Sequence, residues 1–217
     1  MRLGIVASAV VAASLAKTYI GTTDHGSSAA TQTFTGVAIG TPAADRLVVV
    51  IAACYTGNSG GACNGITIGG VAANIVPETN ETGFRIRTVI AWLRVPTGTT
   101  ADIVVSWPTS GPGGISVYNV TGQSSDTPND ADTLASATGT VLTITLTPAE
   151  GSVGVMGGAK SISSTAFDGT LWPVDADIAS TPSGCRILCG SKDELTTSEM
   201  VRVNGATQIR VSAATWR

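Results

Sequence analysis

The chain has 217 residues, of which 43% are hydrophobic and only 12% charged, and its formal net charge is −3. A chain of this length buries roughly 70% of its unfolded surface, so a conventional hydrophobic core is expected. A mean hydropathy of +0.29 excludes a disordered chain, and a pI near 5.0 without any cluster of basic residues excludes nucleic-acid binding as the main task.

The N-terminus permits two interpretations. Residues 1–16 begin with Met1-Arg2, continue with a short apolar stretch and end in Ser14-Leu15-Ala16. This pattern is typical of a secretory signal with a small-residue cleavage site, and the stretch is shorter than the roughly 20 residues of a spanning helix. We expect residues 1–20 to form an uncleaved N-terminal arm that packs on its own domain or on a neighbouring subunit. We expect no membrane partner.

Ten segments rich in β-branched and aromatic residues follow the arm. They are separated by clusters of Gly, Pro, Asn, Asp and Ser, a spacing that predicts an all-β fold. The predicted strands are Thr31–Ile39, Arg46–Cys54, Gly65–Val76, Phe84–Val95, Ala101–Trp107, Gly114–Thr121, Thr140–Thr147, Gly151–Ala159, Ser198–Val203 and Ala206–Trp216.

Three local patterns refine this prediction. Residues 140–147 alternate between polar and apolar side chains and predict a half-exposed strand, whereas the continuous apolar run of 46–54 predicts a central strand covered on both faces. Asn204-Gly205 between two strands predicts a tight hairpin. No long amphipathic helix and no internal repeat is visible, and segments 122–139 and 161–197 are expected to be irregular connections. We predict a single antiparallel β-sandwich over residues 21–217, jelly-roll-like in its topology.

The sequence contains no catalytic signature. His25 is the only histidine, which disfavours a zinc site, and the adjacent Asp24 is poorly placed to orient it as a base. The acidic stretch 126–132 lacks the glycine that a calcium loop needs in its turn, so we expect a solvated loop there. We therefore expect no enzymatic activity, no metal and no cofactor. Trp172, in an irregular segment, is the best candidate for an aromatic residue that contacts a ligand or a partner, and burial beneath the loop is the alternative for it.

The four cysteines leave several pairings open. Cys54 and Cys63 flank a flexible Gly-rich turn that can bring them within disulfide range. If the segment around Cys185 and Cys189 is a strand, both point to the same face about 13 Å apart and each needs another partner. Buried free thiols, disulfides within the chain and disulfides between subunits are the alternatives.

Three segments carry a resemblance to a group of viral proteins. They are Gly4-Ile5-Val6-Ala7-Ser8-Ala9, residues 96–105 (Pro-Thr-Gly-Thr-Thr-Ala-Asp-Ile-Val-Val) and the ending Val211-Ser212-Ala213-Ala214-Thr215-Trp216-Arg217. In these segments and in composition the chain resembles accessory virion proteins of tailed bacteriophages, which include capsid decoration, neck-collar and spike components. The resemblance implies a β-sandwich present in repeated copies, often a trimer.

The expected function follows from that resemblance together with the composition. We expect a non-enzymatic structural component of a virion, which contacts itself as a homo-trimer and other virion proteins and contacts no nucleic acid. Low surface charge suits this role because uncharged faces are desolvated at little cost. The alternative is a carbohydrate- or receptor-binding module of a phage spike or a secreted bacterial adhesin, with a host glycan held near Trp172.

Overall fold

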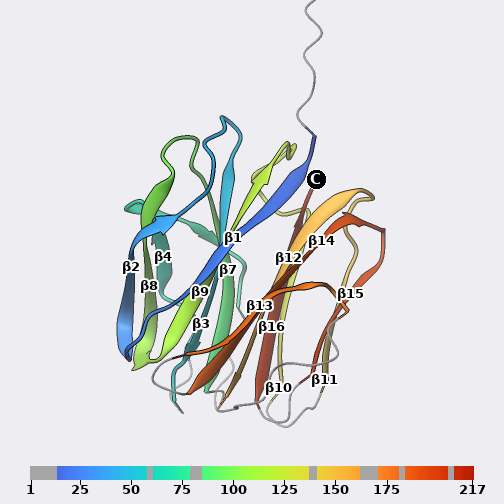
Figure 1. Cartoon of the computed structure of the whole chain (residues 1–217). Coiled ribbons are helices and arrows are strands. Elements are labelled where there is room, and N and C mark those ends of the chain that lie inside the picture. The colour runs from blue at the N-terminus through green and yellow to red at the C-terminus, as the bar shows by residue number, and fades with distance from the viewer. Residues whose placement is uncertain are drawn as a thin grey trace, which may run out of the picture.

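The computed structural model describes residues 14–57, 61–78, 85–136, 141–161, 171–180, 184–204 and 208–217. In these ranges the regular secondary structure consists of sixteen β-strands, and no helix occurs in them (Figure 1). Every strand pair is antiparallel. The predicted all-β, antiparallel fold is therefore confirmed.

The strands form four sheets, here named A to D. In order of pairing, sheet A contains β1 (Ala16–Asp24), β9 (Gly113–Thr121), β3 (Leu47–Tyr55), β7 (Ile86–Arg94) and β6 (Asn74–Ile75). Sheet B contains β2 (Ala29–Ala38), β8 (Thr100–Gly111), β4 (Gly65–Ile68) and β5 (Val71–Ala72). Sheet C contains β10 (Asp130–Ser136), β16 (Ile209–Trp216), β12 (Ser152–Ser161), β14 (Cys185–Leu195) and β13 (Val174–Ala179). Sheet D pairs β11 (Val141–Leu146) with β15 (Glu199–Asn204).

The sheets stack as layers in the order B, A, C, D, and three cores lie between them. Strand β3 contributes side chains to two of these cores. Its residues Val48, Val50 and Ala52 pack toward sheet B, while Leu47, Val49 and Ile51 pack toward sheet C. The third core joins sheets C and D and contains Leu142, Ile144 and Leu146 from β11. The continuous apolar run of β3 thus forms the predicted central strand, covered on both faces, and β11 forms the predicted half-exposed one.

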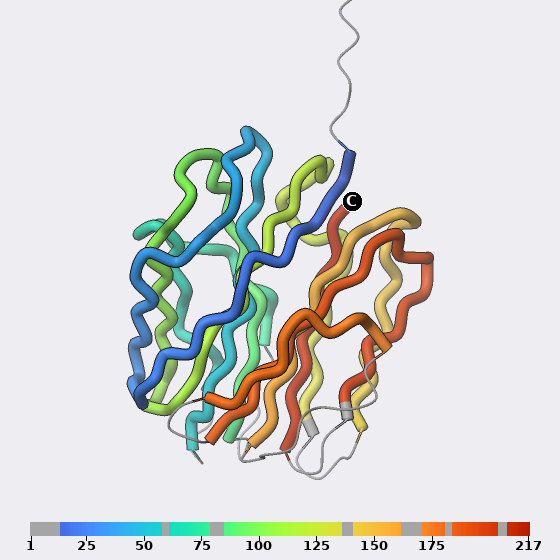
Figure 2. Tube along the Cα trace, viewed as in Figure 1, coloured from blue at the N-terminus to red at the C-terminus, as the bar shows by residue number. Residues whose placement is uncertain are grey.

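The two halves of the chain repeat one strand order. In residues 16–121 the first strand pairs with the last, the last with the third, and the second with the penultimate, as β1-β9-β3-β7 and β2-β8. In residues 130–216 the same order appears as β10-β16-β12-β14 and β11-β15. Sheets A and B belong to the first half and sheets C and D to the second, which Figure 2 displays as a blue-to-green block beside a yellow-to-red block. The two halves share the order of strand pairing but not their amino-acid sequence, so no repeat is visible in the sequence.

Two predictions about connections are wrong. The segment 122–139, expected to be irregular, contains β10, and the segment 161–197 contains β13 and β14. Strands β10 and β13 form the two edges of sheet C, where one side of the backbone is paired, and each of them contains two aspartates. Residues 16–20, expected within the arm, are the first part of β1 and pair with β9. Residues 1–13 and Gly205 of the predicted hairpin lie outside the described residues.

A buried arginine fixes the loops at one end of sheet A. Arg46 is 0% exposed, and its guanidinium donates five hydrogen bonds of 2.7–3.2 Å, all to backbone carbonyl oxygens. The acceptors belong to Ile39, Gly40, Val95, Thr97 and Gly98. Arginine has five N–H donors, so all of them are satisfied and the charge is buried with its hydrogen bonds made.

Gly157 and Gly158 are adjacent in β12 and lie on opposite faces of sheet C, so substitutions at them test how closely sheets A and C pack. A Cβ atom on Gly157 would lie 2.2 Å from Ile51 Cγ2 of sheet A, whereas one on Gly158, on the opposite face, would lie 3.3 Å from Leu188 Cδ2. We expect Gly157→Ala to lower the free energy of unfolding by about 1–3 kcal/mol through overpacking. Gly158→Ala should cost less than about 1 kcal/mol, since the Leu188 side chain can adjust.

The measurement is urea unfolding of both variants at one protein concentration. Equal losses in the two variants would contradict a close approach of the two halves at Gly157.

Candidate functional site

Trp172, the aromatic residue predicted to contact a ligand or partner, lies just before β13 and is 2% exposed. Its six-membered ring packs over β12, where a Cβ atom on Gly154 would lie 2.4 Å from Trp172 Cη2. The ring therefore belongs to the core between sheets C and D. In this position it presents no open face on which a sugar ring could stack.

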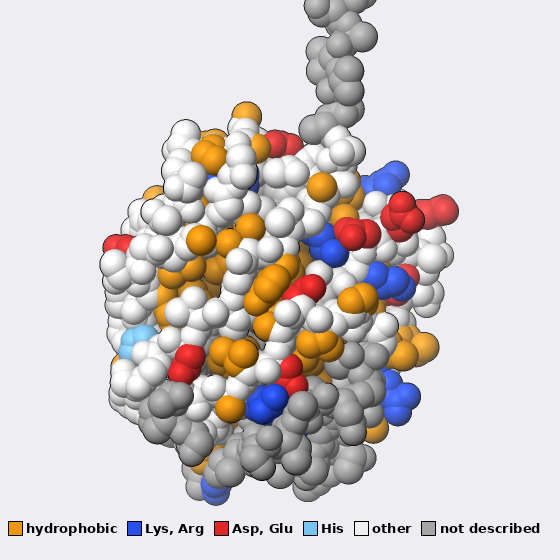
Figure 3. All heavy atoms as spheres, viewed as in Figure 1, with side chains coloured by type: hydrophobic (Ala, Val, Ile, Leu, Met, Phe, Trp, Pro, Cys, Tyr) orange, Lys and Arg blue, Asp and Glu red, His pale blue; other side chains and the backbone are white. Residues whose placement is uncertain are grey.

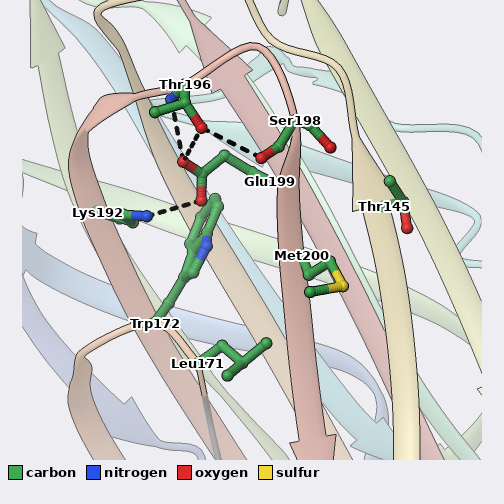
Figure 4. Close-up of a pocket in the computed structure, with 8 residues that line it drawn as sticks. All are labelled: Thr145, Leu171, Trp172, Lys192, Thr196, Ser198, Glu199 and Met200. Atoms are coloured by element: carbon green, nitrogen blue, oxygen red, sulfur yellow. Dashed lines mark hydrogen bonds and ion pairs between the residues drawn. The ribbon is translucent and has the colours of Figure 1, made fainter.

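A surface hollow of about 480 Å³ opens beside Trp172. Figure 4 shows its lining side chains, with Trp172 and Leu171 on the side of β15 opposite to β11. Two of the apolar lining residues are unusually open to solvent, Leu171 at 50% and Met200 at 54%. The other lining residues are Thr145, Lys192, Thr196, Ser198 and Glu199. The hollow thus combines an exposed apolar rim with a polar end.

An ion pair forms the polar end. Lys192 Nζ donates to Glu199 Oε2 at 2.7 Å, and the backbone N–H and the hydroxyl of Thr196 both donate to Glu199 Oε1 at 3.0 Å. Burial by itself would raise the pKa of Glu199, but the hydrogen bonds from Lys192 and Thr196 outweigh it and hold that pKa below its ordinary value. Glu199 is therefore ionised near neutral pH, and these hydrogen bonds hold its carboxylate in one position.

One donor in the hollow's wall is unused. Among the described residues nothing accepts a hydrogen bond from Trp172 Nε1, although the atom is buried. Buried N–H groups usually have an acceptor, because leaving one unpaired costs about 1–3 kcal/mol. Lys192, whose side chain is 38% exposed, is a donor that the hollow does present to solvent.

A second polar cluster joins the two halves of the chain. Tyr118 of β9 donates from its hydroxyl to Asp175 Oδ2 of β13 at 2.8 Å, and Ser191 of β14 donates to the same oxygen at 2.5 Å. Burial, with smaller contributions from Cys189 and Asp175, raises the pKa of Tyr118 far above its ordinary value. The phenol thus stays protonated and acts as a donor across the interface between sheets A and C.

The same cluster continues to the edge of sheet A. Thr22 Oγ1 lies 2.7 Å from Ser116 Oγ and 2.8 Å from the hydroxyl of Tyr19, and 3.7 Å from Cys189 Sγ. These side chains come from β1, β9 and β14, which lie far apart in sequence. The sequence gave no signal for this cluster, because single Ser, Thr and Tyr residues in strands are common.

All four cysteines are free thiols in the structure, so the disulfides that the sequence permits are not formed in it. Cys185 and Cys189 both lie on β14 and pack toward sheet A, which confirms that they share a face. They are 3% and 0% exposed, so neither of these two thiols is open to solvent in the structure.

Burial also decides the chemistry of these thiols. It raises the pKa of Cys54 and of Cys63 to about 12 and raises the pKa of Cys185 and Cys189 as well. A thiol with a raised pKa carries little thiolate near neutral pH and is a poor nucleophile.

The remaining candidate residues occupy structural positions. His25 Nδ1 lies 2.9 Å from the carbonyl oxygen of Ser27, and its ring packs edge-on to Phe34. Asp126 of the acidic stretch forms an ion pair with Arg94, which lowers the pKa of that carboxyl. Within the described ranges no three His, Cys, Asp or Glu side chains gather closely enough to hold a metal ion.

The other tryptophans are core residues, as their strand patterns predict. Trp92, Trp107 and Trp216 are at most 8% exposed, and Trp92 packs edge-on to Trp216 with 6.3 Å between the ring centres. Unlike Trp172, Trp107 and Trp216 have acceptors for their indole N–H groups. Trp172 is thus distinguished by its unpaired N–H and not by exposure.

The chain matches no protein-family model, no curated protein and no solved structure. No helix long and apolar enough to cross a membrane occurs in the described part of the chain.

The lowered pKa of Glu199 predicts a pH-dependent contribution to stability. A carboxyl whose pKa is lower in the folded state stabilises the protein above its ordinary pKa of 4.5 and loses that effect as the pH falls through the folded value. We expect Glu199→Gln to lower the free energy of unfolding at pH 7 by about 1–3 kcal/mol. The difference from the wild type should shrink below about pH 4.5.

Urea unfolding at pH 7 and at pH 3.5 measures this difference. The matched control is Asp193→Asn in the adjacent hairpin, whose carboxylate pairs with Lys17 but is 60% exposed, so it should cost at most about 1 kcal/mol. A loss in Glu199→Gln that is independent of pH would show that the charge of Glu199 is not what stabilises the hollow.

Proposed function

We propose that this protein is a non-enzymatic structural component of a bacteriophage virion, a decoration, collar or spike protein that assembles in several copies. The observation that carries the proposal is the strand order of residues 16–121. Four strands in the order β1-β9-β3-β7 face four in the order β2-β8-β4-β5, so that first pairs with last and second with penultimate. This order supports the jelly roll that we predict from the sequence, an architecture used by viral capsid proteins and by lectins.

The second half supports the same proposal. Its order β10-β16-β12-β14 with β11-β15 repeats that of the first half, and its outer sheet has two strands among the described residues. Two such units stacked through sheets A and C make a block with three cores. A rigid block of this kind suits a protein that stabilises a particle.

The surface supports assembly from several copies. On the face shown in Figure 3, charged side chains gather mainly over β13–β15, whereas the surface over β1 and β2 is largely uncharged with apolar side chains between. A hollow of about 360 Å³ lies there, between Ile20–Thr23 of β1 and Phe34–Ala38 of β2. Surfaces with little charge are desolvated at low cost, which favours contacts with further copies and other virion proteins. We propose a homo-trimer located in the virion.

The native mass tests the proposal. We expect a species near three chain masses by native mass spectrometry or light scattering. We expect reductant to leave it unchanged, because the thiols of Cys54, Cys185 and Cys189 are buried. A monomer at micromolar concentration would contradict the proposed assembly.

The hollow beside Trp172 favours a second candidate, a carbohydrate-binding module on a spike or adhesin. Its volume of about 480 Å³ falls within the range of ligand pockets, and Lys192, Glu199 and several hydroxyls line it. Because the Trp172 ring is buried, a glycan would be held by hydrogen bonds to the exposed polar side chains of the hollow, among them Lys192.

A single substitution separates this candidate from the first. Lys192→Met keeps the side-chain length and removes the ammonium donor, so glycan binding on an array should weaken about tenfold while the native mass stays the same. Lys17→Met, the same change at a different hollow, should leave any glycan binding intact. Unchanged binding by Lys192→Met, or no binding by the wild type, would contradict the carbohydrate candidate.

A further inference from the structure

The two halves differ at one side of their sandwiches. In the second half the strands β10 and β11 pack closely together, and Thr147 donates from its backbone N–H and its hydroxyl to Asp130 Oδ2 at 2.5 and 3.3 Å. In the first half the equivalent strands, β1 and β2, touch at few points. A hollow of about 360 Å³ lies between them, lined by Ile20–Thr23 and Phe34–Ala38. Both lining segments belong to the one continuous described range 14–57.

Bulges occur in both strands that border this hollow and in neither of their equivalents. The pairing of β1 with β9 shifts at Ile20, and the pairing of β2 with β8 shifts at Thr35 and Gly36. Strands β10 and β11 pair with their neighbours without a shift. Gly36 has a φ of +63°, and its N–H donates to Asp102 Oδ1 at 2.8 Å, which fixes the bulge of β2. Because bulges bend a strand and are frequent beside active sites, we attribute the open side of the first half to them.

The hollow combines polar groups with an apolar floor. Ile20, Phe34 and Val37 belong to the core between sheets A and B or pack against it. Thr23 and Thr35 are exposed and bring their hydroxyls to the lining. Ile20 and Thr35 have no residue opposite them in the strand pairing, which leaves their backbone groups outside the regular ladder. None of the described residues that line the hollow carries a charge.

These features disfavour most classes of ligand. A charged ligand would be desolvated there without a counter-charge, and a wholly apolar one would leave threonine hydroxyls and backbone groups without partners. A peptide strand needs a continuous row of backbone groups along the edge that it joins, and the bulges interrupt that row in β1 and in β2. An uncharged ligand with hydroxyl groups around an apolar ring face satisfies both the polar groups and the floor.

We propose that the hollow between β1 and β2 binds a neutral sugar residue. The sugar hydroxyls would bond to Thr23, Thr35 and the backbone groups at the bulges, and the C–H face of the ring would lie on Ile20 and Val37. This site is separate from the hollow beside Trp172, and the inference goes beyond the structural role proposed above. It requires that the side formed by β1 and β2 stays open to solvent in the assembled protein.

Amide chemical shifts of the ¹⁵N-labelled full-length protein test the proposal. Lactose, maltose and cellobiose, which are uncharged disaccharides, are titrated in turn into the native protein. We expect at least one of them to shift the amide signals at the bulges of β1 and β2 in a saturable manner. Shifts confined to the residues around Trp172 would place sugar binding in the other hollow and overturn the proposal. The absence of a saturable shift with every disaccharide would overturn it as well.

Matched variants of β2 measure the contribution of one hydroxyl. Thr35→Val keeps the shape of the side chain and removes the hydroxyl from the hollow, so the dissociation constant of the bound disaccharide should rise about fivefold. Thr33→Val is the control, because Thr33 is exposed on the same strand but does not line the hollow, and it should leave binding unchanged. Equal dissociation constants of the two variants would contradict the proposed site.

Sugar binding and assembly are measured independently of each other. The native mass reports the number of copies and does not depend on a sugar. A multimer that binds no disaccharide at β1 and β2 removes this inference and leaves the structural role standing. A monomer that binds one there removes the proposed assembly and keeps the sugar site.

Discussion

The burial of both faces of sheet A is the constraint on which the rest of the structure depends. Strands β3, β7 and β9 are buried along nearly their whole length, between sheet B on one side and sheet C on the other. Apolar side chains on alternate faces of β3 therefore belong to two different cores. Such a sheet stabilises the protein only if the polar groups it carries find partners within the stack.

The partners come from the other layers, and they join the two halves of the chain. Tyr118 on sheet A donates to Asp175 on sheet C, and Ser212 on sheet C donates to the backbone carbonyl oxygen of Thr88 on sheet A. An ion pair of 3.6 Å between the buried side chains of Arg210 and Glu78 adds a charged link. Because these bonds are directional, they favour one relative placement of the halves over the many that apolar packing alone permits.

The stack also decides where contacts with other molecules can form. Sheets A and C pack against each other, so the surfaces exposed to solvent are the outer faces of sheets B and D and the edges of the sheets. Sheet D has two strands in the described part of the chain, and the hollow lies beside β15. This hollow combines the Lys192–Glu199 ion pair with exposed apolar side chains. Burial raises the pKa of Cys54 and of Cys63 to about 12, so these thiols carry little thiolate near neutral pH.

The sequence by itself determined the fold class, the central strand and most of the strands. Residues 46–54 predict β3 because a strand that is apolar on both faces must be buried on both. Residues 140–147 predict β11 because strict alternation of polar and apolar residues indicates one buried and one solvent-exposed face. Tertiary structure decided β10, β13 and β14, since edge strands such as 130–136 and 174–179, each interrupted by two aspartates, form through their pairing with a neighbour and not through local preference. It also decided that Trp172 is buried, and it brought Lys192, Glu199 and Met200 together around that residue. Periodicity reports whether a side chain faces a core, but which layers share that core depends on contacts between segments far apart in the chain.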